Sequence, residues 1–166
     1  MMLDALIDKL TNSIEEVATG RTLDTEVRRA TRADLKSLGP EWQFDWMKEL
    51  RHGEVYKLIV PELGNTILGL ISLSREPDHV FAHLIENHPR NVGRKKQFAG
   101  VAGNLFAYAA KLSLELGHDG FVSFVAKTEL IDHYRRSLGA TCIGRGPKMY
   151  IGAKSARELI RSYFGG

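Results

Sequence analysis

Residues 79–126 constrain the fold more than any other part of this chain, because they contain a long helix between two strands. Residues 102–116 place their apolar side chains on one helical face: Leu105, Phe106, Ala109, Leu112 and Leu116. The stretches before and after this helix, 79–87 and 121–126, are typical of strands. A strand, a helix and a second strand form a βαβ unit, whose strands lie parallel and are joined by a right-handed crossover.

An antiparallel meander is predicted ahead of this unit. Residues 55–60, 66–73 and 79–87 are strand-like, and turn signals at Gly64-Asn65 and Glu76-Pro77-Asp78 separate them. The other predicted elements are a strand over 25–30, helices over 31–38, 41–51, 129–138 and 155–164, and a hairpin of 141–143 with 148–151. The sequence therefore predicts an α+β domain over residues 25–166, with a mixed sheet between helical layers.

Residues 1–24 precede this domain, and residues 3–17 have helical spacing. Their apolar side chains recur every three or four residues and the pattern ends at Gly20: Leu3, Leu6, Ile7, Leu10, Ile14 and Val17. We expect an amphipathic helix and a linker. The helix would pack on its own domain or on a partner chain, because its polar face mixes Asp, Lys and Glu and so does not favour a membrane surface.

Composition excludes several classes of protein. A single cysteine, Cys142, excludes a disulfide framework and a cysteine zinc site, and we expect a buried, inert thiol. The longest apolar stretch, residues 67–73, is too short to cross a bilayer. Asp4 and Asp8 lie where a signal peptide carries positive charge, so a cytoplasmic location is predicted. His79 and His83 stand too far apart on a strand to share a metal, and no metal site is expected.

The net charge of +3 is unevenly distributed. Acidic residues outnumber basic ones in residues 1–65, and basic ones outnumber acidic ones in 66–166, so the second half is predicted to meet an anion. A nucleic acid, a membrane surface or a phosphorylated small molecule would each qualify. The basic run 90–96 has no aromatic residue among its cations, so we expect no nucleic-acid binding. The mixed polar face of residues 3–17 gives no reason to expect a membrane partner either.

The segment 94–105, RKKQFAGVAGNL, predicts where such an anion would bind. Small residues open the long helix, so an anion can approach its free N–H groups and the positive end of its dipole. Arg90, Arg94, Lys95 and Lys96 lie just upstream. The same glycines would also permit close helix packing without any ligand, with the basic run a solvated loop.

A resemblance to a known family rests on this segment. Gln97-Phe98-Ala99-Gly100-Val101-Ala102 matches the Gln/Arg-x-x-Gly-x-Gly/Ala signature of the GCN5-related N-acetyltransferase (GNAT) superfamily, and Leu105 stands at that motif's first helix leucine. The predicted order of elements over residues 25–151 is also similar to the GNAT order. The loop between Pro89 and Gln97 departs from the family pattern, because the gap of eight residues is longer than usual.

The resemblance implies an acetyl-CoA-dependent N-acetyltransferase in which an amine attacks the thioester directly. The backbone amides of the loop from Gln97 to Gly103 would bind the pyrophosphate of coenzyme A: Gln97, Phe98, Ala99, Gly100, Val101, Ala102 and Gly103. The pantetheine arm would pair with the fourth strand from Ile85 to Asn87, where the two parallel strands splay apart. Arg94, Lys95 and Lys96 are the candidates for the remaining phosphate contacts.

Two residues are candidates for proton transfer. Glu86, near the end of the fourth strand, is the first candidate for the base, with His83 and His88 as alternatives. Tyr134 is the candidate acid by resemblance, but it lies five residues before Gly139 where four is usual. If the helix keeps its register from that glycine, Arg135 takes the place of the tyrosine.

The displaced tyrosine keeps a second function open, a non-catalytic CoA-binding or partner-binding module on the same fold. The acceptor amine is not identified by the sequence. The resemblance places the acceptor near residues 42–50 and 144–148, where Trp42, Phe44 and Trp46 offer an apolar wall and Glu41, Asp45 and Glu49 could hold an ammonium group. A homodimer is left open.

Overall fold

The computed structural model describes residues 2–7 and 14–165. The main sheet has seven strands in the order β3-β4-β5-β6-β8-β10-β9. Their bounds are β3 Glu26–Arg29, β4 Glu54–Ile59, β5 Gly69–Arg75, β6 Val80–Asn87, β8 Val122–Val125, β9 Thr141–Cys142 and β10 Lys148–Ile151. All neighbouring strands are antiparallel except β6 and β8, which are parallel. The predicted meander and βαβ unit are therefore confirmed.

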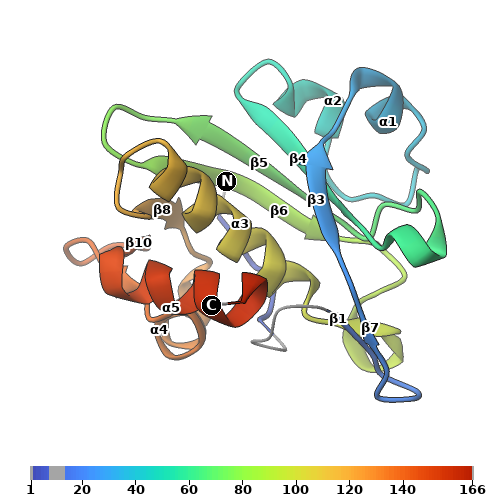
Figure 1. The fold of residues 1–166 in the computed structure, drawn as a ribbon. Helices are drawn as coiled ribbons and strands as arrows, with labels where there is room; N and C mark the ends of the chain where they lie inside the picture. Colours follow the sequence, from blue (N-terminus) through green and yellow to red (C-terminus); the bar gives the residue numbers. More distant parts are fainter. Residues whose placement is uncertain (1, 8–13, 166) are drawn as a thin grey trace.

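Helices cover both faces of this sheet and make three layers (Figure 1). Helices α3 (Val101–Glu115), α4 (Ile131–Leu138) and α5 (Ala153–Phe164) pack on one face, where Phe106, Phe124 and Tyr134 lie in the larger core. Helices α1 (Arg32–Lys36) and α2 (Trp46–Glu49) pack on the other around Trp46. Alternating strand residues feed the two cores, as a sheet buried on both faces requires.

A smaller three-stranded sheet lies beside the main one, in the order β2-β1-β7. Strand β1 (Ile14–Glu16) pairs with β2 (Thr22–Leu23) and with β7 (Phe98–Ala99), and both pairings are antiparallel. The pairing ties the early chain to the segment directly ahead of α3. None of these three strands is predicted from the sequence.

The helix predicted over residues 3–17 is wrong in the part of the chain that the structure describes. Residues 14–16 form β1, and Leu3 forms a parallel bridge with Ala126. Residues 8–13 lie outside the described residues. From Met2 to Ile7 exposed and buried side chains alternate, which is the period of an extended strand. Leu3 and Ile7 satisfy both this period and a helical one, which explains the error.

The helix predicted over residues 41–51 is much shorter in the structure. Helix α2 begins after Asp45, whose carboxylate caps it by accepting from the Lys48 amide at 3.2 Å. The preceding residues form a loop whose amides are bonded to a side chain of β6, described below. No helix in the described part of the chain is both long and apolar enough to cross a membrane.

Candidate functional site

Strands β6 and β8 are paired only at their beginnings, from Val80 to Ala82 on β6. A bulge follows directly, because Ser72 of β5 pairs with Leu84 and Leu73 pairs with Ala82, which leaves His83 as the extra residue. Bulges bend the strand that carries them and are frequent next to active sites. Beyond the bulge, β6 continues along β5 and leaves β8, so a cleft opens between the two parallel strands.

The bulge also determines which backbone groups of β6 face the cleft. The amide of His88 donates to the carbonyl of Leu68 at 2.9 Å, and the antiparallel alternation then directs the N–H and C=O of Glu86 toward β5. The same groups of Ile85 and Asn87 therefore point to the cleft edge. No described residue bonds them there, so this edge offers a ladder to an extended ligand.

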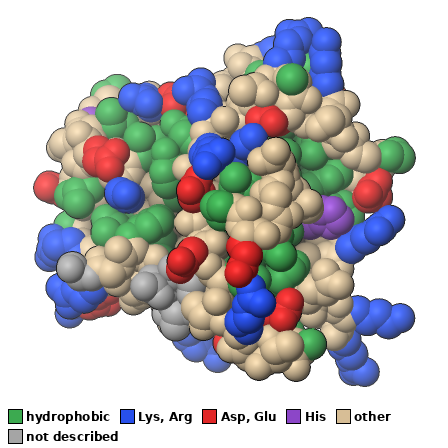
Figure 2. Space-filling model, turned by 45° about the vertical axis from the view of Figure 1, so that its right-hand side comes forward, with side chains coloured by type: hydrophobic (Ala, Val, Ile, Leu, Met, Phe, Trp, Pro, Cys, Tyr) green, Lys and Arg blue, Asp and Glu red, His purple; other side chains and the backbone are tan. Residues whose placement is uncertain are grey.

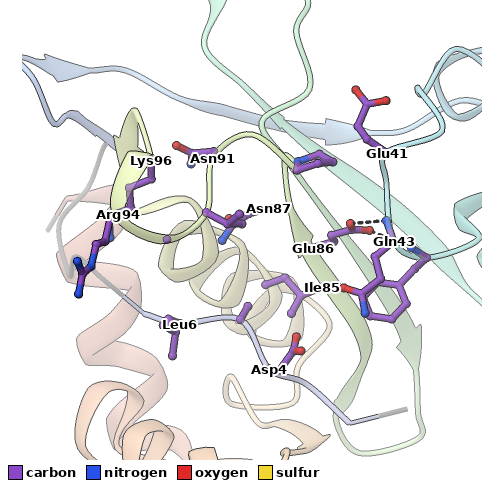
Figure 3. A pocket seen from close by; sticks show the side chains of 15 residues that line it. Asp4, Leu6, Glu41, Gln43, Ile85, Glu86, Asn87, Asn91, Arg94 and Lys96 are labelled. Atoms are coloured by element: carbon purple, nitrogen blue, oxygen red, sulfur yellow. Dashed lines mark hydrogen bonds between the residues drawn. The ribbon is translucent and has the colours of Figure 1, made fainter.

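A cavity of about 640 Å³ lies along this edge (Figure 3). Ile85, Glu86 and Asn87 form its wall on β6, and Asp4 to Leu6 face them from the other side. The remaining lining residues come from the loop before α2 and from the loop after β6: Glu41, Gln43, Phe44, Pro89, Asn91, Val92, Gly93, Arg94 and Lys96. Residues from three separate parts of the sequence, 4–6, 41–44 and 85–96, thus meet in one space.

The cavity has an acidic end and a basic end. Asp4, Glu41 and Glu86 lie toward the loop before α2, whereas Arg94 and Lys96 lie at the opposite end (Figure 3). Between them, the side-chain oxygen Oδ1 of Asn87 is buried without a hydrogen-bond partner. An unsatisfied buried acceptor costs about 1 to 3 kcal/mol, so a donor from a ligand would be stabilised there.

Glu86 is held by three donors from the loop before α2. Its Oε2 accepts from the Gln43 amide at 2.7 Å, and its Oε1 accepts from the Phe44 amide at 3.3 Å and from Trp46 Nε1 at 2.8 Å. A carboxylate has about four lone-pair sites, so about one acceptor site remains. These bonds attach the loop directly ahead of α2 to strand β6.

Residues 97–99, the first part of the predicted phosphate loop, have their backbone engaged within the protein. Asn91 Oδ1 accepts from the amides of Gln97 and Phe98, both at 2.8 Å, and Asn91 Nδ2 donates to the Phe98 carbonyl at 3.0 Å. Phe98 and Ala99 form β7. None of the residues 97–103 lines the cavity, and neither does Lys95.

The helix start itself keeps the predicted form. Gly100 precedes α3 in the left-handed conformation, with φ of 103°, and gives it no side-chain cap. The amides of Val101, Ala102 and Gly103 are the first-turn groups that an α-helix leaves without an internal partner. The second half of the predicted loop therefore retains the features of an anion-binding helix start.

Tyr134, the candidate acid, lies in the core and not on the cavity. Its side chain is fully buried against Phe106, Phe124 and His133, and its hydroxyl donates to the Ala5 carbonyl at 2.6 Å. Burial raises the pKa of the hydroxyl far above its ordinary value. Arg135 points outward instead and pairs with Asp132, so the helix register places the tyrosine inside.

The alternative bases lie away from the cavity. His83 faces α2, with Nδ1 2.5 Å from Glu49 Oε1, and it therefore engages one of the predicted acceptor carboxylates. His88 contacts Trp42 edge-on and accepts from the Arg90 amide at 3.1 Å. Cys142 is half-buried, with Sγ 3.3 Å from Arg135 Nη2. Among the described residues, no three His, Cys, Asp or Glu side chains are placed to hold a metal.

Comparison with solved structures decides the fold. A chain of the AtaT–AtaR complex bound to DNA superposes with a TM-score of 0.57 at 17% identity, covering 81% of this chain and 98% of that one. AtaTR bound to acetyl-CoA gives 0.55 at 16%, covering 82% and 98%. A spermidine N-acetyltransferase SpeG chimera from Vibrio cholerae and hSSAT gives 0.52 at 16%, covering 80% and 98%.

This is the GNAT fold. The predicted α+β class with splayed parallel strands is confirmed. No protein-family model matches the sequence. No curated protein matches it either. The fold is therefore recognised through its geometry, at a level of identity that sequence comparison does not detect.

The residues of this GNAT fold fit a CoA thioester along β6. The cleft edge at Ile85 and Asn87 is unpaired, Asn87 Oδ1 lacks a donor, and cations lie at one end of the cavity. Sequence reasoning missed Asn91 and Asp4 to Leu6. No local pattern in the sequence marks Asn91, and the alternating burial of residues 2–7 has no matching alternation of apolar and polar residues. On the face in Figure 2, Lys and Arg side chains lie in separate groups with acidic side chains among them.

Proposed function

We propose that this protein is an acetyl-CoA-dependent N-acetyltransferase. The observation that carries the proposal is the unpaired edge of β6 at Ile85 and Asn87, lining a cavity with a basic and an acidic end. A CoA thioester has anionic phosphates and a pantetheine arm with amide groups, and an acceptor amine is cationic. The two ends of the cavity match these charges in order.

Three groups of residues would hold the co-substrate: the edge of β6, two cations and the start of α3. Ile85 and Asn87 would pair with the amides of the arm, and the Asn87 side chain would gain its missing donor. Arg94 and Lys96, together with the start of α3, would meet the phosphates. Acetyl-CoA supplies an activated acetyl group, whose transfer forms a C–N bond and releases a thiol. A cleft-facing amide of β6 would donate to the developing negative charge on the carbonyl oxygen.

Glu86 would act at the acceptor end. Three donors fix its carboxylate in place, and its remaining acceptor site can orient an ammonium group or take its proton through a water. The Glu86→Gln variant is expected to lower the acetyl-transfer rate about 100-fold. Its affinity for CoA should stay unchanged, because the arm contacts the backbone of the neighbouring residues.

A second variant separates the chemical role of Glu86 from its role in the loop. Trp46→Phe removes one donor to Glu86 and leaves the carboxylate, so it is expected to affect acetyl transfer far less than Glu86→Gln. Equal losses in both variants would assign Glu86 to holding the loop only. Far-ultraviolet circular dichroism checks that both variants remain folded.

Isothermal titration with CoA tests the first step, and release of thiol from acetyl-CoA with a panel of amines tests the second. Spermidine comes first in the panel, because one structural neighbour is a spermidine N-acetyltransferase. Lysine peptides, peptides with a free N-terminus and aminoglycosides follow. Absence of CoA binding at millimolar concentration, both in the parent chain and in Leu3→Asp, a variant designed to release residues 2–7, would overturn the proposal.

One observation favours a binding-only role for the same cleft. The hydroxyl of Tyr134 is bonded to Ala5 and is closed off from the cavity, so this candidate acid does not face the thioester. A module that binds CoA without turning it over needs no such acid. CoA binding with no thiol release for any amine, unchanged by Glu86→Gln, would support this role.

A further inference from the structure

Residues 2–7, named here the strap, lie along the free edge of β8 inside the cleft. The Leu3 amide donates to the Val125 carbonyl at 2.6 Å, and the Lys127 amide donates to the Leu3 carbonyl at 2.8 Å. Together with the parallel bridge between Leu3 and Ala126, these bonds add one strand step to the end of β8. The strap thus occupies backbone positions that the splay leaves open on β8.

The strap is bonded again further along, to helix α4. The Ala5 carbonyl accepts from the hydroxyl of Tyr134 at 2.6 Å, and the Ile7 amide donates to His133 Nε2 at 2.8 Å. Leu3, Ala5 and Ile7 turn into the core, with exposed fractions of 1%, 9% and 8%. Each of them alternates with an exposed residue, so a single extended segment is seated by its buried side chains.

The seating of the strap closes Tyr134 off from the cavity. The tyrosine hydroxyl can donate one hydrogen bond, and it donates that bond to the Ala5 carbonyl. The strap also forms the cavity wall opposite Ile85. It therefore limits the width of the cleft at the place where a thioester would lie beside β6. A ligand that reaches Tyr134 must therefore replace the strap.

We propose that the strap is an autoinhibitory element that competes with the CoA thioester for the cleft between β6 and β8. The inference rests on the proposed function, because the competitor it names is the proposed co-substrate. Release of the strap widens the cleft and frees the Tyr134 hydroxyl to face the sulfur. The site then changes from a closed form without an acid to an open form with one.

The bonding of the strap suits reversible release. Four hydrogen bonds and the buried side chains of Leu3, Ala5 and Ile7 hold it, whereas β1 is paired with both β2 and β7. The strap can therefore leave the cleft in a local opening while the smaller sheet keeps its pairing. If only a fraction of molecules is open, the apparent affinity for CoA is reduced by that fraction.

The test compares two charge insertions in the strap. Leu3→Asp places a carboxylate at a buried position and expels the strap, whereas Met2→Asp places the same charge one residue away at a position 52% exposed. Titration with CoA is expected to show at least a 10-fold higher affinity for Leu3→Asp than for the parent chain. Met2→Asp should stay within about twofold of the parent.

Hydrogen exchange supplies a readout that does not depend on affinity. In the parent chain, CoA should speed exchange at Leu3 and Lys127, whose amides are bonded only while the strap is seated. Equal CoA affinity of Leu3→Asp and the parent, with both amides still protected at saturating CoA, would overturn autoinhibition and leave the proposed function standing. No CoA binding by Leu3→Asp, with Lys127 deprotected, would overturn both.

Tyr134→Phe provides a milder variant if Leu3→Asp does not fold. It keeps the ring contacts of the core and removes only the bond to Ala5. Its CoA affinity is expected to rise several-fold, with faster exchange at Lys127. Unchanged CoA affinity together with unchanged exchange at Lys127 would contradict the autoinhibitory role of the strap.

Discussion

At the scale of single residues, Asn91 shows how one side chain can shape a loop that carries a motif. Its amide group bonds the N–H of Gln97 and both backbone groups of Phe98, and it is 6% exposed. Asn91 therefore holds the longer loop between Pro89 and Gln97 in place. The motif is present in the sequence, but the backbone groups of its first residues, Gln97 and Phe98, are bonded to Asn91.

The Asn91→Ala variant is expected to lower the free energy of unfolding by about 2 to 4 kcal/mol, because it leaves two buried backbone groups of Phe98 and the part-buried amide of Gln97 without partners. Urea denaturation measures this loss. Asn65→Ala, at an exposed position, is the matched control and should stay within about 0.5 kcal/mol of the parent. Equal midpoints for the two variants would contradict the role of Asn91.

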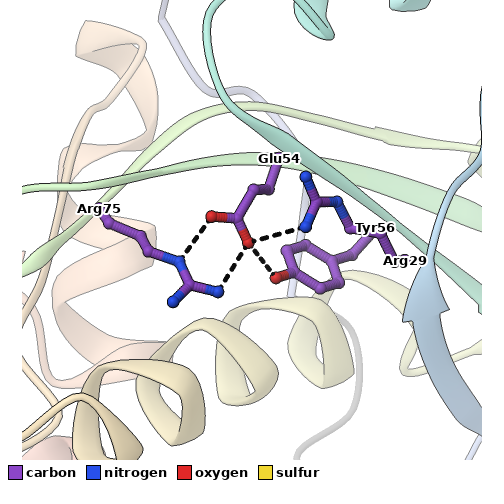
Figure 4. Close-up of polar contacts among 4 residues, drawn as sticks. All are labelled: Arg29, Glu54, Tyr56 and Arg75. Atoms are coloured by element: carbon purple, nitrogen blue, oxygen red, sulfur yellow. Dashed lines mark hydrogen bonds and ion pairs between the residues drawn. The ribbon is translucent and has the colours of Figure 1, made fainter.

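At the scale of elements, a carboxylate joins three neighbouring strands on the outer part of the sheet (Figure 4). Glu54 of β4 accepts from Arg75 Nε of β5 at 2.5 Å, from Tyr56 of its own strand at 2.5 Å and from Arg29 of β3 at 3.2 Å. Burial alone would raise the pKa of Glu54, but the bonds from Arg75 and Tyr56 outweigh it and lower the pKa below its usual value.

This depressed pKa predicts a dependence of stability on pH. The contribution of Glu54 is fully present above its unfolded pKa of about 4.3, and it is lost as the pH falls through the lower folded value. Glu54→Gln is expected to cost about 1 to 2 kcal/mol at pH 7 and to flatten the decline below pH 4.3. Thermal unfolding from pH 7 to 3 measures this, with the exposed Glu62→Gln as control.

The contact of α3 with the sheet depends on a glycine of β5. A Cβ at Gly69 would lie 2.6 Å from Val101 Cγ1 and 3.1 Å from Leu105 Cδ1, so Gly69→Ala would push the start of α3 away. We expect Gly69→Ala to lower the free energy of unfolding by about 1 to 3 kcal/mol and to weaken CoA binding. Gly146→Ala, with no atom within 4 Å of the new Cβ, is the control. Unchanged CoA affinity in folded Gly69→Ala would contradict a role for the helix start.

Most elements of the main sheet and α3 could be predicted because each has a single clear period. Two helices could not be placed correctly, and both errors have a long-range cause. Leu3 and Ile7 fit an extended period as well as a helical one, and the bonds to the end of β8 and to α4 select the extended one over residues 2–7. The loop before α2 is bonded to Glu86, a partner about 40 residues away in sequence.

The site was predictable to a similar extent. The wall at Ile85, Glu86 and Asn87 follows from the position of the splay, which the βαβ pattern and the family resemblance indicate together. The bulge at His83 has no sequence signal, although it determines which backbone groups face the cleft. The bond between Tyr134 and Ala5 joins residues 129 apart and could not be derived from local spacing.

At the scale of the whole molecule, the three layers meet at the cleft. The layer of α1 and α2 supplies the loop bonded to Glu86, the sheet supplies the open edge of β6, and the layer of α4 supplies the Tyr134 hydroxyl that holds the strap. Each layer thus determines one wall of the cleft or what lies against it. The strap connects the sheet, at the end of β8, with the layer of α4.

The anchoring of the strap also has a consequence for the order of events during synthesis. Residues 2–7 leave the ribosome well over 100 residues ahead of His133 and Tyr134, which hold Ile7 and Ala5. Closing so long a loop is slow relative to local pairing. The meander and α3 can therefore assemble around a cleft that the strap has not yet entered.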